Sequence, residues 1–188
     1  PMLALGVTLI ASSLAAMTIY VAEDGNDDTG DGTVEKPYAT PKKGVAQAET
    51  DDVVFLKNGT YTTTSHIVLD KKITLRGESR DGVTVKNTAA RSGTARVIKL
   101  SKAGARVETM TIRDGKVSGS WCNEADVGGN INMTAAGVIS NCVIAAGQPA
   151  SKAGTLAEGD RGGGNIFAGA VAGKAFVIGV GEDVQVNE

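Results

Sequence analysis

Short apolar runs with a period of two residues recur along the chain and are separated by turn residues. Alternation of apolar and polar positions is typical of β-strands that bury one face. Gly, Asn, Asp and Ser interrupt the runs at intervals of roughly ten residues. The pattern therefore predicts many short strands: VVFL from 53, HIVL from 66, ITL from 73, VTV from 83, VIKL from 97 and MTI from 110.

The second half of the chain contains a repeat. Segments 103–115, 135–147 and 169–181 align without gaps, and 71–77 is a fainter copy. Each has an apolar pair before a terminal glycine: Met110 and Ile112, Cys142 and Ile144, Phe176 and Ile178, and, in the faint copy, Ile73 and Leu75. The second members of these pairs recur at nearly even intervals, and GGNI recurs with a similar spacing, at 128–131 and 163–166.

A repeat of this length favours a solenoid in which each repeat is one coil. The alternative is an antiparallel sandwich or barrel, and Asn58-Gly59 after VVFLK would suit a hairpin in it. In the solenoid, Met110, Cys142 and Phe176 are expected to lie over one another inside a single column.

A short helix is predicted before the first of these coils. Thr40 can cap it, Pro41 suits its first position, and Val45, Ala46 and Ala48 give it a small apolar face. Such a helix can cover the exposed hydrophobic end of a solenoid.

The start of the chain, 1–22, carries no charged side chain, and residues 2–16 are almost wholly apolar or small. This run resembles the apolar part of a secretory signal, without the usual preceding basic residues, and it is shorter than a membrane span. We therefore divide the chain into an apolar leader, 1–17, which is signal-like or an assembly or capping segment, and a solenoid domain, 18–188.

Composition narrows the function classes. The 188 residues have a net charge of −2, with scattered Lys and Arg, which argues against a nucleic-acid binder. Only 4% are aromatic, and 25 are glycine, which suits stacked aliphatic strands joined by turns. Cys142 is expected to be a buried thiol and Cys122 a free loop residue, with a Cys122–Cys142 bridge as the alternative.

The run from Ile19 to Tyr61 resembles the opening of right-handed parallel β-helix proteins of the pectate-lyase-like superfamily. It has a strand, an Asp/Gly loop ending in Gly-Thr, a Lys-Pro-aromatic-x-Thr step, a short helix, and a strand followed by Lys-Asn-Gly-Thr-Tyr. KITLRGESRDGVTV (72–85) and GGN…AGVISNCVI are similar to later coils. The resemblance implies an all-β, right-handed, single-stranded parallel β-helix with a short N-terminal capping helix. It implies the fold more than the activity, since the fold hosts lyases, hydrolases, esterases, adhesins and scaffolds.

The acidic loop after the first strand is the candidate metal site. Asp24, Asn26 and Asp28 have spacing suited to calcium, and Glu35 falls where an EF-hand places its bidentate glutamate. Thr29, however, occupies the position that such a loop reserves for glycine. A solvated connector is therefore the favoured interpretation, with no cofactor, and a calcium site is the alternative.

Candidate catalytic residues are isolated. Arg113, Asp114 and Lys116 form the best cluster, yet the matched positions in the next coils are alanine, glycine or valine, so a solvated turn is favoured. No catalytic residue is assigned. His66 is expected at the surface. Trp121 lies in the loop 115–129, which should project beside the loop 145–164, where a ligand groove would be expected.

These observations predict a secreted or cell-surface module with a structural, self-assembling or glycan-binding role and without catalysis. The alternative is the N-terminal part of a polysaccharide lyase or related carbohydrate-active enzyme. The expected partners are further copies, as a homo-oligomer or an end-to-end assembly, and a polysaccharide, with neither nucleic acid nor a membrane span.

Overall fold

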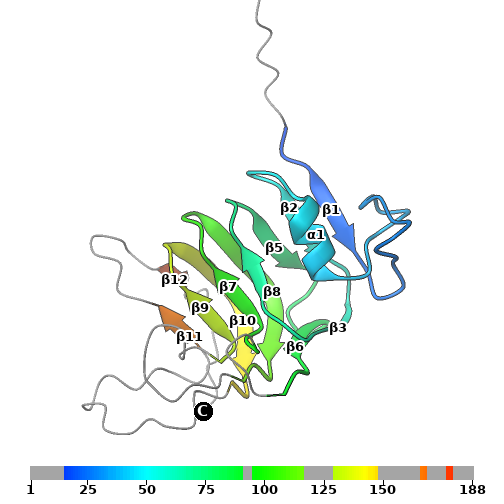
Figure 1. Ribbon diagram of the computed structural model, residues 1–188. Coiled ribbons are helices and arrows are strands. Elements are labelled where there is room, and N and C mark those ends of the chain that lie inside the picture. Colours follow the sequence, from blue (N-terminus) through cyan, green and yellow to red (C-terminus); the bar gives the residue numbers. More distant parts are fainter. Residues whose placement is uncertain (1–14, 91–94, 117–128, 148–165, 169–176, 180–188) are drawn as a thin grey trace, which may run out of the picture.

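The computed structural model describes residues 15–90, 95–116, 129–147, 166–168 and 177–179. These ranges contain one short helix and strands that pair in parallel (Figure 1). The elements are β1 (Thr18–Val21), α1 (Pro41–Gln47), β2 (Val53–Leu56), β3 (Gly59–Thr63), β4 (Ile67–Leu69), β5 (Thr74–Gly77), β6 (Val83–Asn87), β7 (Ile98–Leu100), β8 (Ala105–Arg113), β9 (Ile131–Met133), β10 (Gly137–Ala145), β11 (Ile166–Ala168) and β12 (Val177–Gly179).

The strands form three parallel legs, each contributed once per coil. Leg 1 contains β1, β2, β5, the first part of β8, the first part of β10, and β12. Leg 2 contains β3, β6 and the second parts of β8 and β10. Leg 3 contains β4, β7, β9 and β11. Crossovers between parallel strands are right-handed, and the chain forms the expected right-handed parallel β-helix.

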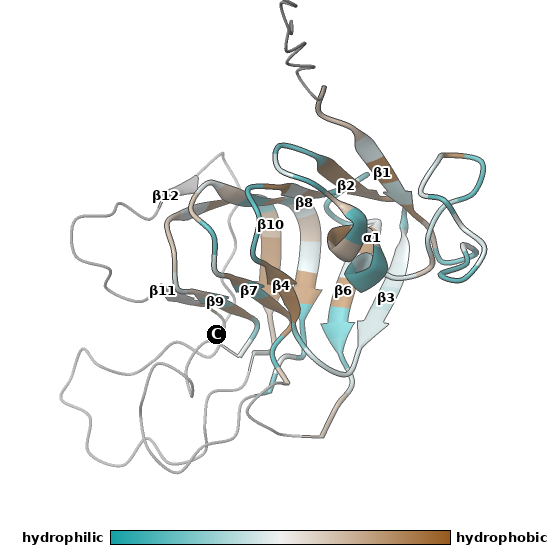
Figure 2. Ribbon diagram, turned by 45° about the horizontal axis from the view of Figure 1, so that its top comes forward, coloured by the Kyte–Doolittle hydropathy of each residue, from teal (hydrophilic) through white to brown (hydrophobic). Residues whose placement is uncertain are grey.

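The core consists of columns of inward side chains that stack from coil to coil. Figure 2 shows the hydrophobic stretches of the strands in brown. In leg 3, Ile67, Ile98 and Ile131 are in register and almost completely buried. Met110 and Cys142 are also partners in register, both with 0% exposure, which confirms the central part of the predicted column. Phe176 lies outside the described residues.

Two predicted alignments of the repeat are wrong. Leu75 is in register with Val107 and not with Ile112. Ile112 is in register with Val85 of β6, on leg 2. Ile178 is in register with Ile139 and not with Ile144. The cause is the bend at Thr109 and Asn141, because it places Val107 and Ile139 on leg 1 but Ile112 and Ile144 on leg 2 of the same strands.

In β8 and β10, the coil turns from leg 1 into leg 2 at a residue whose backbone has a left-handed conformation. Thr109 in β8 has a φ of 58° and Asn141 in β10 has a φ of 50°. Asn141 Nδ2 donates a hydrogen bond of 3.3 Å to Thr109 Oγ1. The two bends therefore stack. Asn58-Gly59 lies between leg 1 and leg 2 of an earlier coil, and the flanking strands β2 and β3 pair with other coils rather than with each other as a hairpin.

Helix α1 begins as the sequence predicts. Thr40 is the N-cap, its hydroxyl accepts a hydrogen bond from Lys43 N, and Pro41 opens the helix. Val45 and Ala48 are buried, whereas Ala46 is exposed. Gly44 brings the helix close to leg 1, since a Cβ there would lie 2.8 Å from a methyl group of Val21 and of Val54.

The N-terminal end of the solenoid is covered differently in each leg. In leg 1, the outer edge of the terminal strand β1 bonds to the following loop, through Tyr20 N to Gly32 O and Tyr38 N to Tyr20 O. In leg 2, the Glu23 carboxylate accepts a hydrogen bond of 2.7 Å from Thr60 N, at the edge of β3. In leg 3, α1 takes the place of a preceding strand beside β4 (Figure 2). Edge strands that are covered in these ways are protected from uncontrolled pairing.

Replacing Gly44 with valine should destabilise the protein. The new side chain would overlap the methyl groups of Val21 and Val54, and overpacking of a close contact costs about 1–3 kcal/mol. Urea unfolding measures the change. Gln47→Val, on the exposed side of the same helix, is the matched control, and equal losses in the two variants would contradict this account of how α1 docks.

Candidate functional site

The outer face of leg 1 carries a row of side chains in register across five strands. Successive coils place Tyr20 beside Phe55, Phe55 beside Arg76, Arg76 beside Glu108, and Glu108 beside Ser140. These residues point outward because alternate residues of a strand face opposite sides of a sheet, and the intervening ones, such as Leu75 and Val107, are fully buried. We call this row, together with Arg106, the leg-1 face.

The N-terminal half of the leg-1 face is aromatic. The rings of Tyr20 and Phe55 meet edge to face, with centroids 5.6 Å apart and an interplanar angle of 64°. Both residues are partly exposed. Edge-to-face contact fixes the two rings against each other, so they form a preformed apolar platform at the surface.

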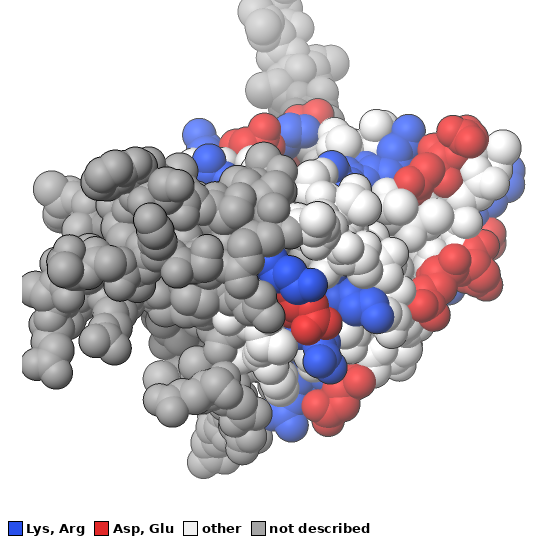
Figure 3. All heavy atoms as spheres, turned by 60° about the horizontal axis from the view of Figure 1, so that its bottom comes forward, with Lys and Arg blue, Asp and Glu red and all other residues white. Residues whose placement is uncertain are grey.

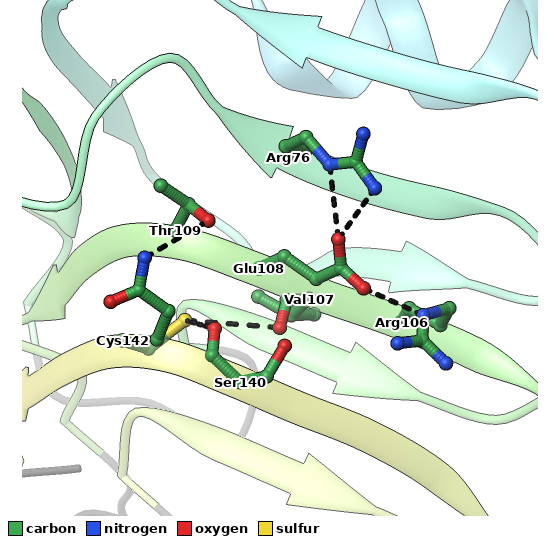
Figure 4. A network of polar contacts seen from close by, with 8 residues as sticks. Arg76, Arg106, Val107, Glu108, Thr109, Ser140 and Cys142 are labelled. Carbon is green, nitrogen blue, oxygen red and sulfur yellow. Dashed lines mark hydrogen bonds and ion pairs between the residues drawn. The ribbon is translucent and has the colours of Figure 1, made fainter. Parts of the chain in front are cut away.

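The next two coils carry a charged cluster, shown in Figure 4. Glu108 Oε2 accepts hydrogen bonds from Arg76 Nε at 3.0 Å and Nη2 at 2.7 Å. Its other oxygen, Oε1, accepts one of 2.6 Å from Arg106 Nε. The Glu108 side chain is only 11% exposed, whereas those of Arg76 and Arg106 are 46% and 45% exposed. The carboxylate is thus enclosed and both guanidinium groups keep an accessible side.

Burial of Glu108 acts to raise its pKa, but the hydrogen bonds and positive charges of Arg106 and Arg76 outweigh it and lower the pKa below its ordinary value. Glu108 therefore stays ionised at neutral pH and fixes both arginines. Two cations on one carboxylate leave one positive charge in excess, so this part of the leg-1 face suits anionic groups.

Side chains of the acidic loop accept hydrogen bonds from nearby backbone groups. Asn26 Oδ1 accepts hydrogen bonds from Asp28 N at 2.8 Å and Thr29 N at 2.9 Å. Asp27 accepts hydrogen bonds from Ala39 N, Thr40 N and the Thr40 hydroxyl, which ties the loop to the start of α1. These bonds give the loop a defined shape.

Three of the four predicted calcium ligands, Asp24, Asn26 and Glu35, line one depression of about 330 Å³, and Asp28 is not part of its lining. Among the described residues, no group of three or more His, Cys, Asp or Glu side chains is close enough to hold a metal ion. Both hydrogen bonds to the Asn26 side-chain oxygen compete with a cation for it. Calcium at Asp24, Asn26, Asp28 and Glu35 stays a prediction.

The other residues singled out in the sequence occupy separate places. Arg113 and Asp114 form a surface ion pair of 3.0 Å at the end of β8. His66 borders β4, far along the coil from the leg-1 face. Cys142 is a free thiol, and its burial raises its pKa to about 11, so it is a poor nucleophile. Cys122, Trp121 and most of both projecting loops lie outside the described residues.

Sequence inspection missed the arginine–glutamate cluster. Arg76 and Glu108 are far apart in the sequence, on different coils, and Arg106 is the outward residue before Glu108 on the same strand. The available signal was that two successive leg-1 strands carry charged residues at outward positions. These are Arg76 in the LRG of β5, and Arg106 and Glu108 in the RVE of β8. It could be recognised only after Leu75 had been aligned with Val107.

The remaining surface offers no single-sign field in the view of Figure 3, where basic and acidic side chains alternate over the described residues. Within the described part of the chain, no helix has the length and apolarity needed to cross a membrane.

Replacing Glu108 with glutamine should lower the free energy of unfolding by about 1–2 kcal/mol at pH 7, because charge-assisted hydrogen bonds to two arginines are weakened. When folding lowers the pKa of a carboxylate, the carboxylate stabilises the protein at pH values above its ordinary pKa, which is 4.5 for Glu108. That contribution is lost as pH falls through the folded-state pKa.

The difference between wild type and Glu108→Gln, measured by urea unfolding, should therefore be present at pH 7 and shrink below about pH 4. Glu49→Gln is the control for an exposed ion pair. The Glu49 side chain is 66% exposed, and its Oε1 lies 3.9 Å from Lys71 Nζ. A Glu108→Gln difference that did not depend on pH would contradict this account.

Comparison with known proteins identifies a local relative. No family model matches the chain. A pectate lyase of Emericella nidulans, PEL9, is 39% identical over 59 residues, which cover 31% of this chain and 14% of the lyase. The match thus takes up a small part of the relative's length.

Two solved structures of pectin methylesterase in complex with hexasaccharides also match. They are 17% and 18% identical to the chain, each with a TM-score of 0.47, and the match covers 68% of this chain and 42% of theirs. The architecture is established by the parallel register of the legs themselves. By that register the described chain is a right-handed parallel β-helix, and a stretch of 59 residues in it is similar to a pectate lyase.

Proposed function

We propose that this protein is a carbohydrate-active β-helix protein that binds an acidic polysaccharide along the leg-1 face. The observation that carries the proposal is the Arg76–Glu108–Arg106 cluster, in register with the aromatic pair Tyr20–Phe55. The similarity to a pectate lyase supports this interpretation better than that of a non-catalytic scaffold.

The charged cluster suits a carboxylate-bearing sugar. A guanidinium group recognises a carboxylate through parallel N–H donors. Arg76 uses Nε and Nη2 for Glu108, and Arg106 uses Nε, so further N–H groups of both arginines are available to a ligand. Glu108 holds both side chains in position before the ligand arrives, which reduces the entropy lost on binding.

The aromatic pair suits the apolar face of a sugar ring. Phe55 lies one coil before Arg76, and Tyr20 lies one coil before Phe55, and neighbouring parallel strands are about 4.8 Å apart. A polymer lying across the strands would meet the aromatic rings and then the arginines. An elongated ligand is therefore favoured over a single small molecule.

We also propose that the whole protein cleaves its polysaccharide, because the relative is named a pectate lyase. An extracellular location accords with such a substrate. Assembly into homo-oligomers or end-to-end arrays stays a prediction, and analytical ultracentrifugation over a range of protein concentrations would test it.

Arg76→Ala combined with Arg106→Ala should weaken binding of polygalacturonate by about tenfold or more, because two charge-assisted contacts are lost. Phe55→Ala should weaken it about fivefold through loss of the ring surface. Arg113→Ala, which removes a comparably exposed arginine of β8 on leg 2, should have no effect. Affinity electrophoresis in gels containing the polymer measures these changes.

The neutral polymer amylose serves as the ligand control. Equal retardation by both polymers, or equal losses in the Arg113 variant and the double variant, would count against the proposed face. Incubation with polygalacturonate, followed by ultraviolet absorbance of unsaturated products, separately tests lyase activity. A protein that binds but does not cleave would support the non-catalytic glycan-binding role.

A further inference from the structure

The Asn58-Gly59 pair lies at the corner between β2 and β3 and takes no part in the leg-1 face. Asn58 is exposed and Gly59 is partly exposed. An asparagine that precedes glycine is especially prone to spontaneous deamidation, because glycine has no side chain to shield its backbone nitrogen from the amide carbon. Water is the only other reactant, and it reaches this corner. The chain thus carries a reactive pair at its surface.

The backbone of this pair is tied to the connection between β5 and β6. We call residues 78–82 of that connection the corner loop. Gly59 N donates a hydrogen bond of 2.8 Å to Gly82 O, and Gly59 is in register with Val83. This bond is therefore the first rung between β3 and β6. The Gly59 nitrogen can turn toward another group only when the rung opens.

The corner loop also fixes Asn58. The Asn58 amide N donates a hydrogen bond of 2.8 Å to Glu78 Oε2, and Asn58 Oδ1 accepts one of 2.7 Å from Ser79 Oγ. The same Ser79 hydroxyl accepts a hydrogen bond of 3.1 Å from Gly82 N. Gly82 leaves room for this arrangement, since a Cβ there would overlap Asn58 Oδ1 and Ser79 Oγ. The Asn58 side chain is thus seated against the loop.

We infer that Asn58 is a latent self-modification site that the corner loop keeps unreactive. Once the rung opens, Gly59 N attacks Asn58 Cγ. The N–Cγ bond forms, the Cγ–Nδ2 bond breaks, and ammonia leaves with the proton that Gly59 N gives up. Water then adds to one of the two carbonyl groups of the cyclic imide, which yields aspartate or isoaspartate. The reaction uses no group beyond this chain and water.

Either product should hinder the corner from closing again. The new carboxylate lies next to the Glu78 carboxylate, which bonds the backbone of Asn58 in the unmodified chain, and like charges repel. Isoaspartate also lengthens the main chain just before Gly59, where the register between β3 and β6 begins. The modification is therefore expected to proceed in one direction and to loosen the start of leg 2.

The test compares the full chain with the peptide Leu-Lys-Asn-Gly-Thr-Tyr, blocked at both ends, which has the sequence of 56–61 without the corner loop. Both are incubated at mildly alkaline pH. Mass spectrometry of digests measures conversion of the amide to the acid, and an isoaspartate methyltransferase assay measures isoaspartate. Asn58 in the folded chain should react at least about tenfold more slowly than the peptide, because the rung must open first.

Ser79→Ala should accelerate deamidation of the folded chain about threefold or more, because the hydrogen bond that seats the Asn58 side chain is lost. Ser101→Ala is the matched control. The Ser101 hydroxyl donates a hydrogen bond of 3.3 Å to Leu69 O, away from the corner, and its removal should leave the rate unchanged.

Gly82→Ala should accelerate the reaction at least as much as Ser79→Ala, since the new Cβ displaces the Asn58 side chain. Gly44→Val is its control, because it destabilises the chain through α1 and leaves the corner loop intact. Circular dichroism checks that each variant is folded. Ser79→Ala, which adds no atoms, keeps the inference testable if Gly82→Ala does not fold.

Three outcomes would overturn the inference. Equal rates in the folded chain and the peptide would show that the corner loop gives no protection. A slower reaction in Ser79→Ala would make the hydroxyl an activator of the amide instead of a restraint. Equal acceleration in Gly82→Ala and Gly44→Val would make global unfolding the route. None of these measurements involves a polysaccharide, so the inference stands or falls separately from the proposed function.

Discussion

Parallel pairing between successive coils is the interaction on which the rest of this structure depends. Each strand obtains its backbone hydrogen bonds from the coils above and below, and the same register decides which side chains face inward. Because side chains alternate, a slip of one residue would move Leu75 and Val107 to the surface and Arg76 and Glu108 into the core. Burial of the aliphatic columns therefore also fixes the outward row.

The charged cluster follows from this register and from local electrostatics together. Glu108 loses much of its hydration, which is unfavourable for a carboxylate unless it is compensated. Arg76, from the preceding coil, and Arg106, on the same strand, provide that compensation. The cluster thus connects two coils on the outside, while Leu75 and Val107 connect them on the inside. A surface that is fixed on both sides of the sheet is well suited to hold a rigid polymer.

Much of the fold could be predicted from the sequence, because the signals were local or repeated. Thr40 and Pro41 indicated the helix start, and the Met110 and Cys142 segments showed the coil. The alignment of Leu75 with Ile112 was wrong since it relied on a glycine after each apolar pair, whereas in β8 and β10 a bend at Thr109 and Asn141 separates two legs within one strand.

The candidate site was harder to predict for the same reason. Arg76 and Glu108 become neighbours only when the register is known, and neither lies in a recognisable motif. The acidic loop, in contrast, was prominent in the sequence, and its Asn26 and Asp27 serve hydrogen bonds of the loop itself.

The unequal coils have a consequence for how such a molecule can change. In leg 1, the stretch from Val53 to its partner Thr74 is little more than half as long as the stretch from Val138 to its partner Val177, although the strands meet in the same parallel manner. The described strands of the two coils are of similar length, so the added residues lie outside those strands. A lineage or a designer can therefore lengthen one connection, and thereby build a new recognition loop, without adjusting the rungs on either side.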